Sequence, residues 1–86
     1  MENTQDYQDY QDYRAEILGI VRSNASPGIM RNKLEDYHEN DLADVFPHLS
    51  VAERRKLCRI LNLDMLADIF EYIDEKQAAE YLDELD

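Results

Sequence analysis

The sequence predicts an all-α fold arranged as a short α-solenoid, a superhelix of stacked helical hairpins with a repeat of about 24 residues. Apolar residues recur at helical spacing from Arg14 to the end of the chain, and no useful length shows the alternation of a strand. The segment 42–46, Leu-Ala-Asp-Val-Phe, returns as 66–70, Leu-Ala-Asp-Ile-Phe, an offset of 66 − 42 = 24 residues. At 86 residues, the chain holds one small domain.

Residues 1–13 are predicted to form an acidic, tyrosine-rich arm before the helical-repeat domain of residues 14–86. Gln-Asp-Tyr occurs three times in this arm, which has no basic residue. Low-complexity termini of this kind are typically flexible. In the alternative, Tyr7, Tyr10 and Tyr13 lie along one side of a helix, and the arm extends the first helix.

Six short helices are expected after the arm, each with one stripe of apolar residues at a spacing of three or four. In chain order, the stripes are Ile17, Leu18 and Val21; Ile29, Met30, Leu34 and Tyr37; Leu42, Val45, Phe46 and Leu49; Leu57, Cys58, Ile60 and Leu61; Leu66, Ile69, Phe70 and Ile73; and Ala78, Leu82 and Leu85.

Capping residues mark the starts of two of these helices. Ser26 followed by Pro27 is typical of an N-cap with proline at the first helical position, where no N–H is needed for the helix. Ser50 and Glu53 have the spacing of a capping box, in which each side chain accepts a hydrogen bond from the other residue's N–H. We therefore expect helices to begin directly after Ser26 and Ser50.

Two acidic residues and one proline mark further boundaries. Asp64 and Asp74 precede the last two apolar stripes and are interpreted as helix starts. Pro47 falls inside the third expected helix, where it lacks an N–H and its ring clashes with the carbonyl group of Ala43. That helix should therefore end early or kink, and the sequence does not decide between the two.

The 24-residue offset extends beyond the repeated segment. It also pairs Leu49 with Ile73, Ser50 with Asp74, Cys58 with Leu82 and Leu61 with Leu85. A more divergent copy upstream places Leu18, Val21, Ala25, Ser26, Leu34 and Tyr37 at the corresponding positions. A single hairpin cannot bury its own apolar face, so the hairpins are expected to stack and share a core.

Composition excludes several classes of function. The formal charge of 9 − 20 = −11 argues against nucleic-acid binding, which needs clustered Lys and Arg. No apolar stretch approaches the ~20 residues that cross a bilayer, so this segment is not expected to insert into a membrane.

Cys58 has no partner for an internal disulfide, and its repeat counterpart is a leucine, so it is expected in the core. Phosphate loops, nucleophile elbows and zinc-ligand spacings are absent, so an enzyme is not expected.

Three segments carry a resemblance to a known family. They are His38-x-x-Asp41-Leu42-Ala43-Asp44-Val45-Phe46, Leu49-x-x-x-Glu53-Arg54 and Ala67-Asp68-Ile69-Phe70. In this order they resemble the intracellular N-terminal domain of MgtE-type magnesium transporters, over about residues 17–86. The family's domain runs on into further helices, a pair of CBS modules and a pore domain, so the resemblance implies a chain truncated at its C-terminus. The last hairpin of such a chain is expected to leave apolar surface around Leu82 and Leu85 open to a partner.

The resemblance implies a regulatory, magnesium-sensing domain that helps to gate the pore. It would lie on the cytoplasmic side of the membrane as a soluble part of an integral membrane protein. Its partners would be the CBS modules and the transmembrane domain of the same transporter, and a homodimer is left open. Mg²⁺ would bind weakly through surface carboxylates shared with the CBS modules. The family motif places the metal ligand at Asp68, with Asp44 as its repeat counterpart.

Each of these features also has a structural explanation. Asp44 and Asp68 would be ordinary carboxylates near helix N-termini. Residues 64–86 hold nine acids against Lys76, a local charge of 1 − 9 = −8, which is typical of a solvated helix face. The basic residues Arg54, Arg55, Lys56 and Arg59 could dock an acidic partner, or they would balance Glu53 and the carboxylates of the neighbouring hairpin. The alternative function is a purely structural protein-docking module resembling the middle domain of the flagellar motor switch protein FliG.

Overall fold

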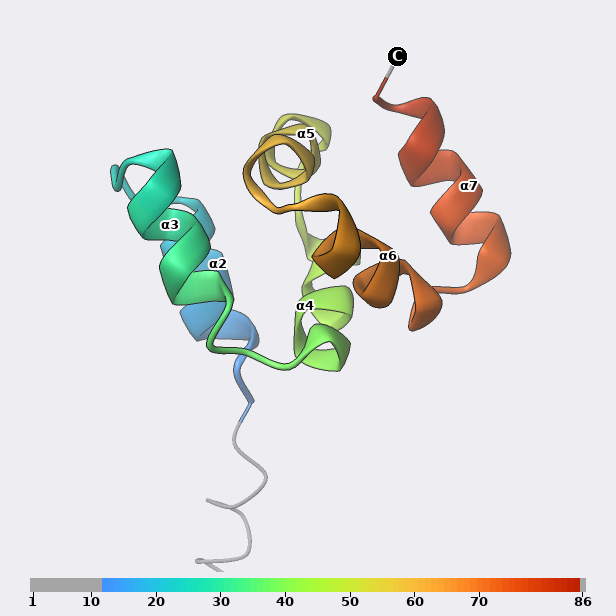
Figure 1. The fold of residues 1–86 in the computed structure, drawn as a ribbon. Coiled ribbons are helices and arrows are strands. Elements are labelled where there is room, and N and C mark those ends of the chain that lie inside the picture. The colour runs from blue at the N-terminus through green and yellow to red at the C-terminus, as the bar shows by residue number, and fades with distance from the viewer. Residues whose placement is uncertain (1–11, 86) are drawn as a thin grey trace, which may run out of the picture.

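The computed structural model describes residues 12–85, which form six α-helices and one 3₁₀ turn and contain no strand (Figure 1). The all-α class predicted from the sequence is therefore confirmed for these residues. In chain order the elements are α2 Arg14–Val21, α3 Pro27–Leu34, α4 Glu39–Val45, η1 Phe46–His48, α5 Val51–Ile60, α6 Leu63–Glu71 and α7 Glu75–Asp83. None of these helices combines the length and the apolar character needed to cross a membrane.

Most of the predicted N-terminal arm, residues 1–11, lies outside the described residues. Its last two residues are described, and both contact the helical domain. The Asp12 carboxylate accepts hydrogen bonds from the backbone N–H of Arg14 at 2.9 Å and from the Arg14 guanidinium at 3.0 Å. The Tyr13 ring packs edge-on against Tyr37, with ring centroids 5.6 Å apart. The end of the arm is thus attached to α2 and to the loop after α3.

Three of the predicted helix starts are confirmed. Ser26 caps α3, with Pro27 in the first turn, and its hydroxyl accepts a hydrogen bond from a backbone N–H. Ser50 and Glu53 form the capping box of α5, with hydrogen bonds of 3.1 Å and 2.9 Å. The Asp74 carboxylate caps α7 by accepting from two backbone N–H groups. Each cap satisfies N–H groups that the helix itself leaves without acceptors.

The predicted start at Asp64 is wrong. Helix α6 begins at Leu63, and its N-cap is Asn62, whose side-chain oxygen accepts from the N–H of Met65 at 2.8 Å. Asparagine caps helices as well as aspartate does, so it competes successfully for this position. The repeat contained the correct signal, because Asn62 lies 62 − 38 = 24 residues after His38, the N-cap of α4.

Pro47 ends its helix rather than kinking it. Helix α4 stops at Val45, and the chain continues as the 3₁₀ turn η1. A continuing α-helix would need the N–H that proline lacks. The turn places the Phe46 side chain in the core, where it is fully buried.

The helix starts keep the 24-residue register. Helices α3, α5 and α7 begin at Pro27, Val51 and Glu75, which gives 51 − 27 = 24 and 75 − 51 = 24. Helices α4 and α6 begin at Glu39 and Leu63, again 63 − 39 = 24. Helix α4 packs between α2 and α6, while α3 packs against α2 and α5 (Figure 1). The molecule is elongated, with principal extents of 50 × 31 × 22 Å.

The core runs through all six helices. Its buried residues are Ile17, Val21, Met30, Leu34, Leu42, Ala43, Val45, Phe46, Leu49, Leu57, Ile60, Leu61, Met65, Ile69 and Tyr81. Phe46 joins the last two hairpins, since its ring lies 5.7 Å from the rings of both Phe70 and Tyr81. Ile29, which was predicted in an apolar stripe, is instead about half exposed.

Candidate functional site

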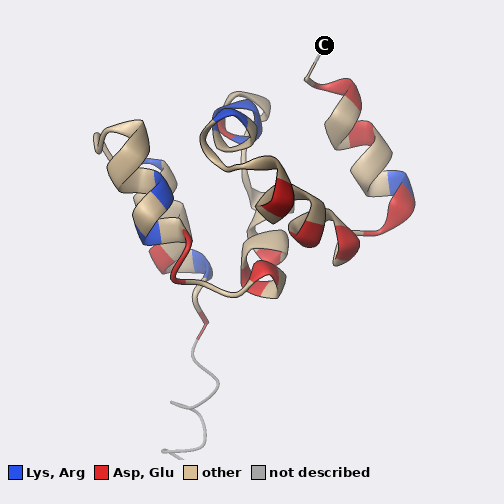
Figure 2. Ribbon diagram, in the orientation of Figure 1, with Lys and Arg blue, Asp and Glu red and all other residues tan. Residues whose placement is uncertain are grey.

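The two carboxylates predicted to bind metal lie at equivalent places on neighbouring helices. Asp44 is on α4 and Asp68 is on α6, and both residues are exposed. Figure 2 shows that acidic residues line α4, α6 and α7, whereas basic residues gather on α3 and α5. The structure therefore separates an acidic part, which contains Asp44 and Asp68, from a more basic part.

These carboxylates do not make a complete metal cage within the chain. Among residues 12–85, no three His, Cys, Asp or Glu side chains are grouped so that they could hold a metal ion. Mg²⁺ prefers six oxygen ligands, keeps several waters and takes only one or two carboxylates from a protein. Asp44 and Asp68 thus fit an ion whose other ligands come from water or from a second surface, and they do not fit a closed site.

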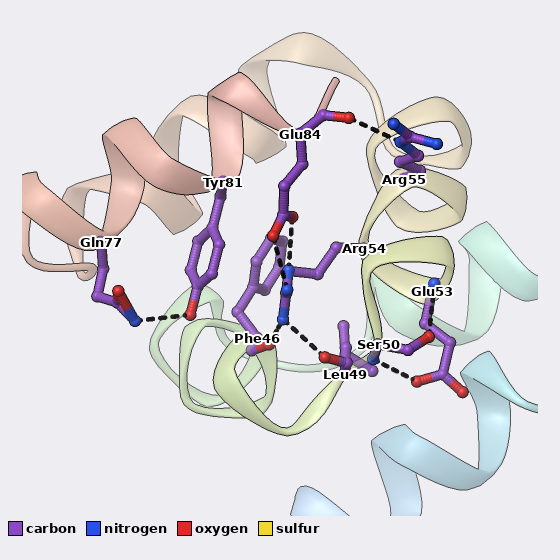
Figure 3. Close-up of polar contacts among 9 residues, drawn as sticks. All are labelled: Phe46, Leu49, Ser50, Glu53, Arg54, Arg55, Gln77, Tyr81 and Glu84. Atoms are coloured by element: carbon purple, nitrogen blue, oxygen red, sulfur yellow. Dashed lines mark hydrogen bonds and ion pairs between the residues drawn. The ribbon is translucent and has the colours of Figure 1, made fainter. Parts of the chain in front are cut away.

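A polar cluster lies between η1, α5 and α7, around Arg54 (Figure 3). The Arg54 guanidinium forms a bidentate ion pair with Glu84, and both N···O distances are 2.8 Å. It also donates to the carbonyl oxygens of Phe46 at 2.9 Å and Leu49 at 2.6 Å. The Arg54 guanidinium carbon lies 4.6 Å from the centre of the Tyr81 ring, a cation–π contact. One side chain therefore joins the end of η1 to the end of α7.

Both partners of this ion pair have shifted pKa values. Hydrogen bonding to Glu84 raises the pKa of Arg54, although burial acts in the opposite direction. Hydrogen bonding to Arg54 lowers the pKa of Glu84 below its usual value. The side chain of Arg54 is only 12% exposed, so the pair is shielded from solvent more than an ordinary surface pair.

A second ion pair joins α2 to the start of α5. Arg22 donates to Glu53 at 2.8 Å, and Glu53 also accepts from the backbone N–H of Ser50. These hydrogen bonds, that of Arg22 first, lower the pKa of Glu53 to about 2. Lys56 strengthens the same junction by donating to the carbonyl oxygen of Val21 at 2.8 Å. The start of α5 is thus fixed to the end of α2 by polar contacts.

The prediction that the basic cluster balances neighbouring carboxylates is confirmed for Arg54. Glu53 has a different partner, Arg22, which sequence reasoning did not identify. Sequence reasoning also did not predict that Arg54 donates hydrogen bonds to the carbonyl oxygens of Phe46 and Leu49. A signal was present: a proline that ends a helix leaves carbonyl groups without donor partners, and Arg54 follows Pro47 by seven residues.

An apolar groove lies beside α5, α6 and α7. Helix α6 contributes Leu63, Leu66, Ala67 and Phe70 to its lining, and its volume is about 270 Å³. The remaining lining comes from Cys58, Leu82 and Leu85. Cys58 is half-buried and packs against the core, as predicted in part, and burial raises the pKa of its thiol. The exposure predicted around Leu82 and Leu85 is confirmed, since these residues are 52% and 44% exposed.

This combination defines a class of protein: an all-helical domain with an acidic surface, ion pairs between hairpins and an open apolar groove. The chain belongs to the family of MgtE intracellular N domains, whose family model matches residues 37–86. That family is not a catalytic one. No curated protein and no solved structure matches the chain. The match begins just before α4, so it covers both hairpins that carry the repeated segment.

Proposed function

We propose that this chain is a regulatory, magnesium-sensing domain of a magnesium transporter. Family membership over residues 37–86 is the observation that carries the proposal. In this role the domain lies on the cytoplasmic side of the membrane and acts through the CBS modules and transmembrane domain of the same transporter. Ion binding would change how the domain sits against those partners and thereby favour a closed pore.

The proposed ion contacts are the carboxylates of Asp68 and, second, Asp44. Both are exposed, and within the described part of the chain neither makes an ion pair that would compete with Mg²⁺. The acidic residues of α4, α6 and α7 would repel carboxylates on the partner domain. A divalent ion between the two domains would remove this repulsion and let the domains approach. Because the other ligands come from a partner domain, binding by this chain alone should be weak.

We further propose that the hairpins form the short solenoid expected from the sequence. The 24-residue register of helix starts supports this arrangement, as does the hydrogen bond from Arg31 to the carbonyl of Ile60. Its counterpart one repeat later is the bond from Arg55 to the carbonyl of Glu84, since 55 − 31 = 24 and 84 − 60 = 24. A solenoid would present Asp44 and Asp68 at regular intervals along one surface.

The test is a Mg²⁺ titration of the chain, followed by backbone amide shifts in NMR, with K⁺ at matched ionic strength as the control. We expect Mg²⁺-specific shifts around Asp68 and smaller ones around Asp44. Asp68→Asn should remove the shifts on α6, whereas the matched variant Glu80→Gln, on the exposed side of α7, should leave them unchanged. Shifts spread over all carboxylates and equal in K⁺ would indicate simple screening and contradict the proposal.

A further inference from the structure

A pocket with basic side chains in its lining lies between α3 and α5, which pack against each other. The lining residues are Pro27, Gly28 and Arg31 of α3 and Lys56, Arg59 and Ile60 of α5. The pocket has a volume of about 320 Å³, at the lower end of the range for small-molecule sites. Figure 2 shows that basic residues gather on these two helices, away from the acidic α6 and α7. All charged residues in this described lining are therefore cations.

Two of these cations are held in place by the backbone of a neighbouring helix. The Lys56 ammonium donates to the carbonyl oxygen of Val21 at 2.8 Å, and the Arg31 guanidinium donates to that of Ile60 at 3.5 Å. Each contact uses only one of the N–H donors that its side chain carries, so further donors are left for a ligand. The packing of the helices thus sets the positions of both side chains before any ligand binds.

Arg59 is not accounted for by such a structural contact. Its side chain makes no hydrogen bond or ion pair with any residue in the described range 12–85. Neither Arg31 nor Lys56 forms an ion pair in this range, although acidic residues of the chain outnumber basic ones by 20 to 9. Three cations that share a pocket without a carboxylate repel one another, and a bound anion would remove this repulsion.

We propose that this pocket binds the phosphate group of a small, freely diffusing metabolite. Guanidinium groups match the geometry of phosphate oxygens, and a lysine ammonium adds a compact positive charge. The formal charge of −11 disfavours an anionic membrane or a large polyanion as the ligand. A small anion inside the pocket responds mainly to the three cations, because salt screens charges beyond about 8 Å at physiological ionic strength.

The test is a titration of the full chain with sodium diphosphate, followed by backbone amide shifts in NMR, with sodium chloride at matched ionic strength as the control. EDTA removes divalent ions, so the result is independent of the Mg²⁺ titration. We expect saturable binding in the millimolar range, with shifts centred on Gly28, Arg31 and Arg59. Inorganic phosphate should cause shifts at the same residues but bind more weakly, because it carries fewer charges.

Charge-matched variants of the chain then locate the site. Arg59→Gln should weaken diphosphate binding about fivefold. Lys33→Gln removes another exposed cation of α3, one that does not line this pocket, and should leave binding within about twofold.

Gly28→Asp gives a second test, because it adds a carboxylate to the pocket and should weaken binding at least as much as Arg59→Gln. This variant should fold, since a Cβ at Gly28 meets no atom within 4 Å and an acidic residue is favourable in the first turn of a helix. Circular dichroism checks that each variant is folded.

Three results would overturn the proposal. The first is an absence of saturable, diphosphate-specific shifts up to about 10 mM. The second is an equal loss of binding in folded Arg59→Gln and Lys33→Gln. The third is co-sedimentation of the chain with phosphatidylglycerol vesicles that Arg59→Gln abolishes, together with no binding of diphosphate, which would make a lipid surface the ligand.

Discussion

The α4–α5 hairpin and the α6–α7 hairpin share a residue pattern but not an environment. Segment 42–46 is largely buried between α2 and α6, and segment 66–70 lines an open groove. The polar contacts differ too, because the repeat counterparts of Glu53 and Arg54 are Gln77 and Ala78, which make no ion pairs. The comparison teaches that the sequence pattern specifies the helices, whereas the helices packed against each one decide which of its residues are buried.

The largest expected effect separates the two phenylalanines of the repeat. Phe46→Ala should destabilise the chain by about 3–5 kcal/mol, because it removes a fully buried ring that contacts two other rings. Phe70→Ala should cost about 1–2 kcal/mol, because its ring is partly exposed to the groove. Urea unfolding of both variants measures the difference, and equal losses would mean that the groove is covered in solution.

Arg54 should give the second-largest effect. Arg54→Ala is expected to destabilise the chain by about 2–4 kcal/mol, since it leaves the Glu84 carboxylate and two carbonyl groups without their donor. Arg55→Ala is the matched control: its side chain is exposed and makes one bond to a carbonyl oxygen, so its loss should be under about 1 kcal/mol. Similar unfolding midpoints for the two variants would exclude Arg54 as the link between η1 and α7.

Local rules made most of the fold predictable. Apolar periodicity gave the six helices, and the short-range chemistry of Ser26, Ser50 and Asp74 gave three of their starts. Pro47 predicted an interruption of its helix. The sequence did not predict that the interruption would be a 3₁₀ turn with the Phe46 side chain buried in the core. Exposure at Leu82 was predictable because the repeat predicts that neighbouring hairpins bury each other's apolar residues, and none of the described helices follows α7.

The candidate sites were less predictable, because they depend on contacts between residues far apart in the chain. Arg22 and Glu53 are 31 residues apart and Arg54 and Glu84 are 30 apart, and no periodicity pairs them. Of the residues that line the groove, only Leu82 and Leu85 were predicted to be exposed, and the contribution of α6 to the lining was not predicted. Asp68 stays a prediction, because its proposed ion is shared with a surface outside this chain.

The third prediction concerns the pH dependence of stability, which should again distinguish the α4–α5 hairpin from the α6–α7 hairpin. The pKa of Glu53 is lowered from 4.5 to about 2, so its ionised form is the one that stabilises the fold. That contribution is complete above about pH 4.5 and is lost as the pH falls toward 2. Glu53→Gln should therefore flatten the fall in stability across this range, measured by urea unfolding at several pH values. Gln77→Glu, at the equivalent position of α7, is the matched control, and it should leave the fall in place.

The smallest expected effect compares the N-caps of α5 and α7. Ser50→Ala and Asp74→Ala should each cost about 1 kcal/mol, since each removes the side-chain acceptor at a helix start. The two substitutions should speed hydrogen exchange over different lengths of the chain. Ser50 begins the helix that carries Arg54, so hydrogen exchange should speed up in α5 and at the α7 junction together. Asp74→Ala should speed exchange in α7 alone, because α7 is the last of the described helices. Faster exchange in α5 after Asp74→Ala would show that the two hairpins unfold as one unit, and the difference between them would then be confined to the folded state.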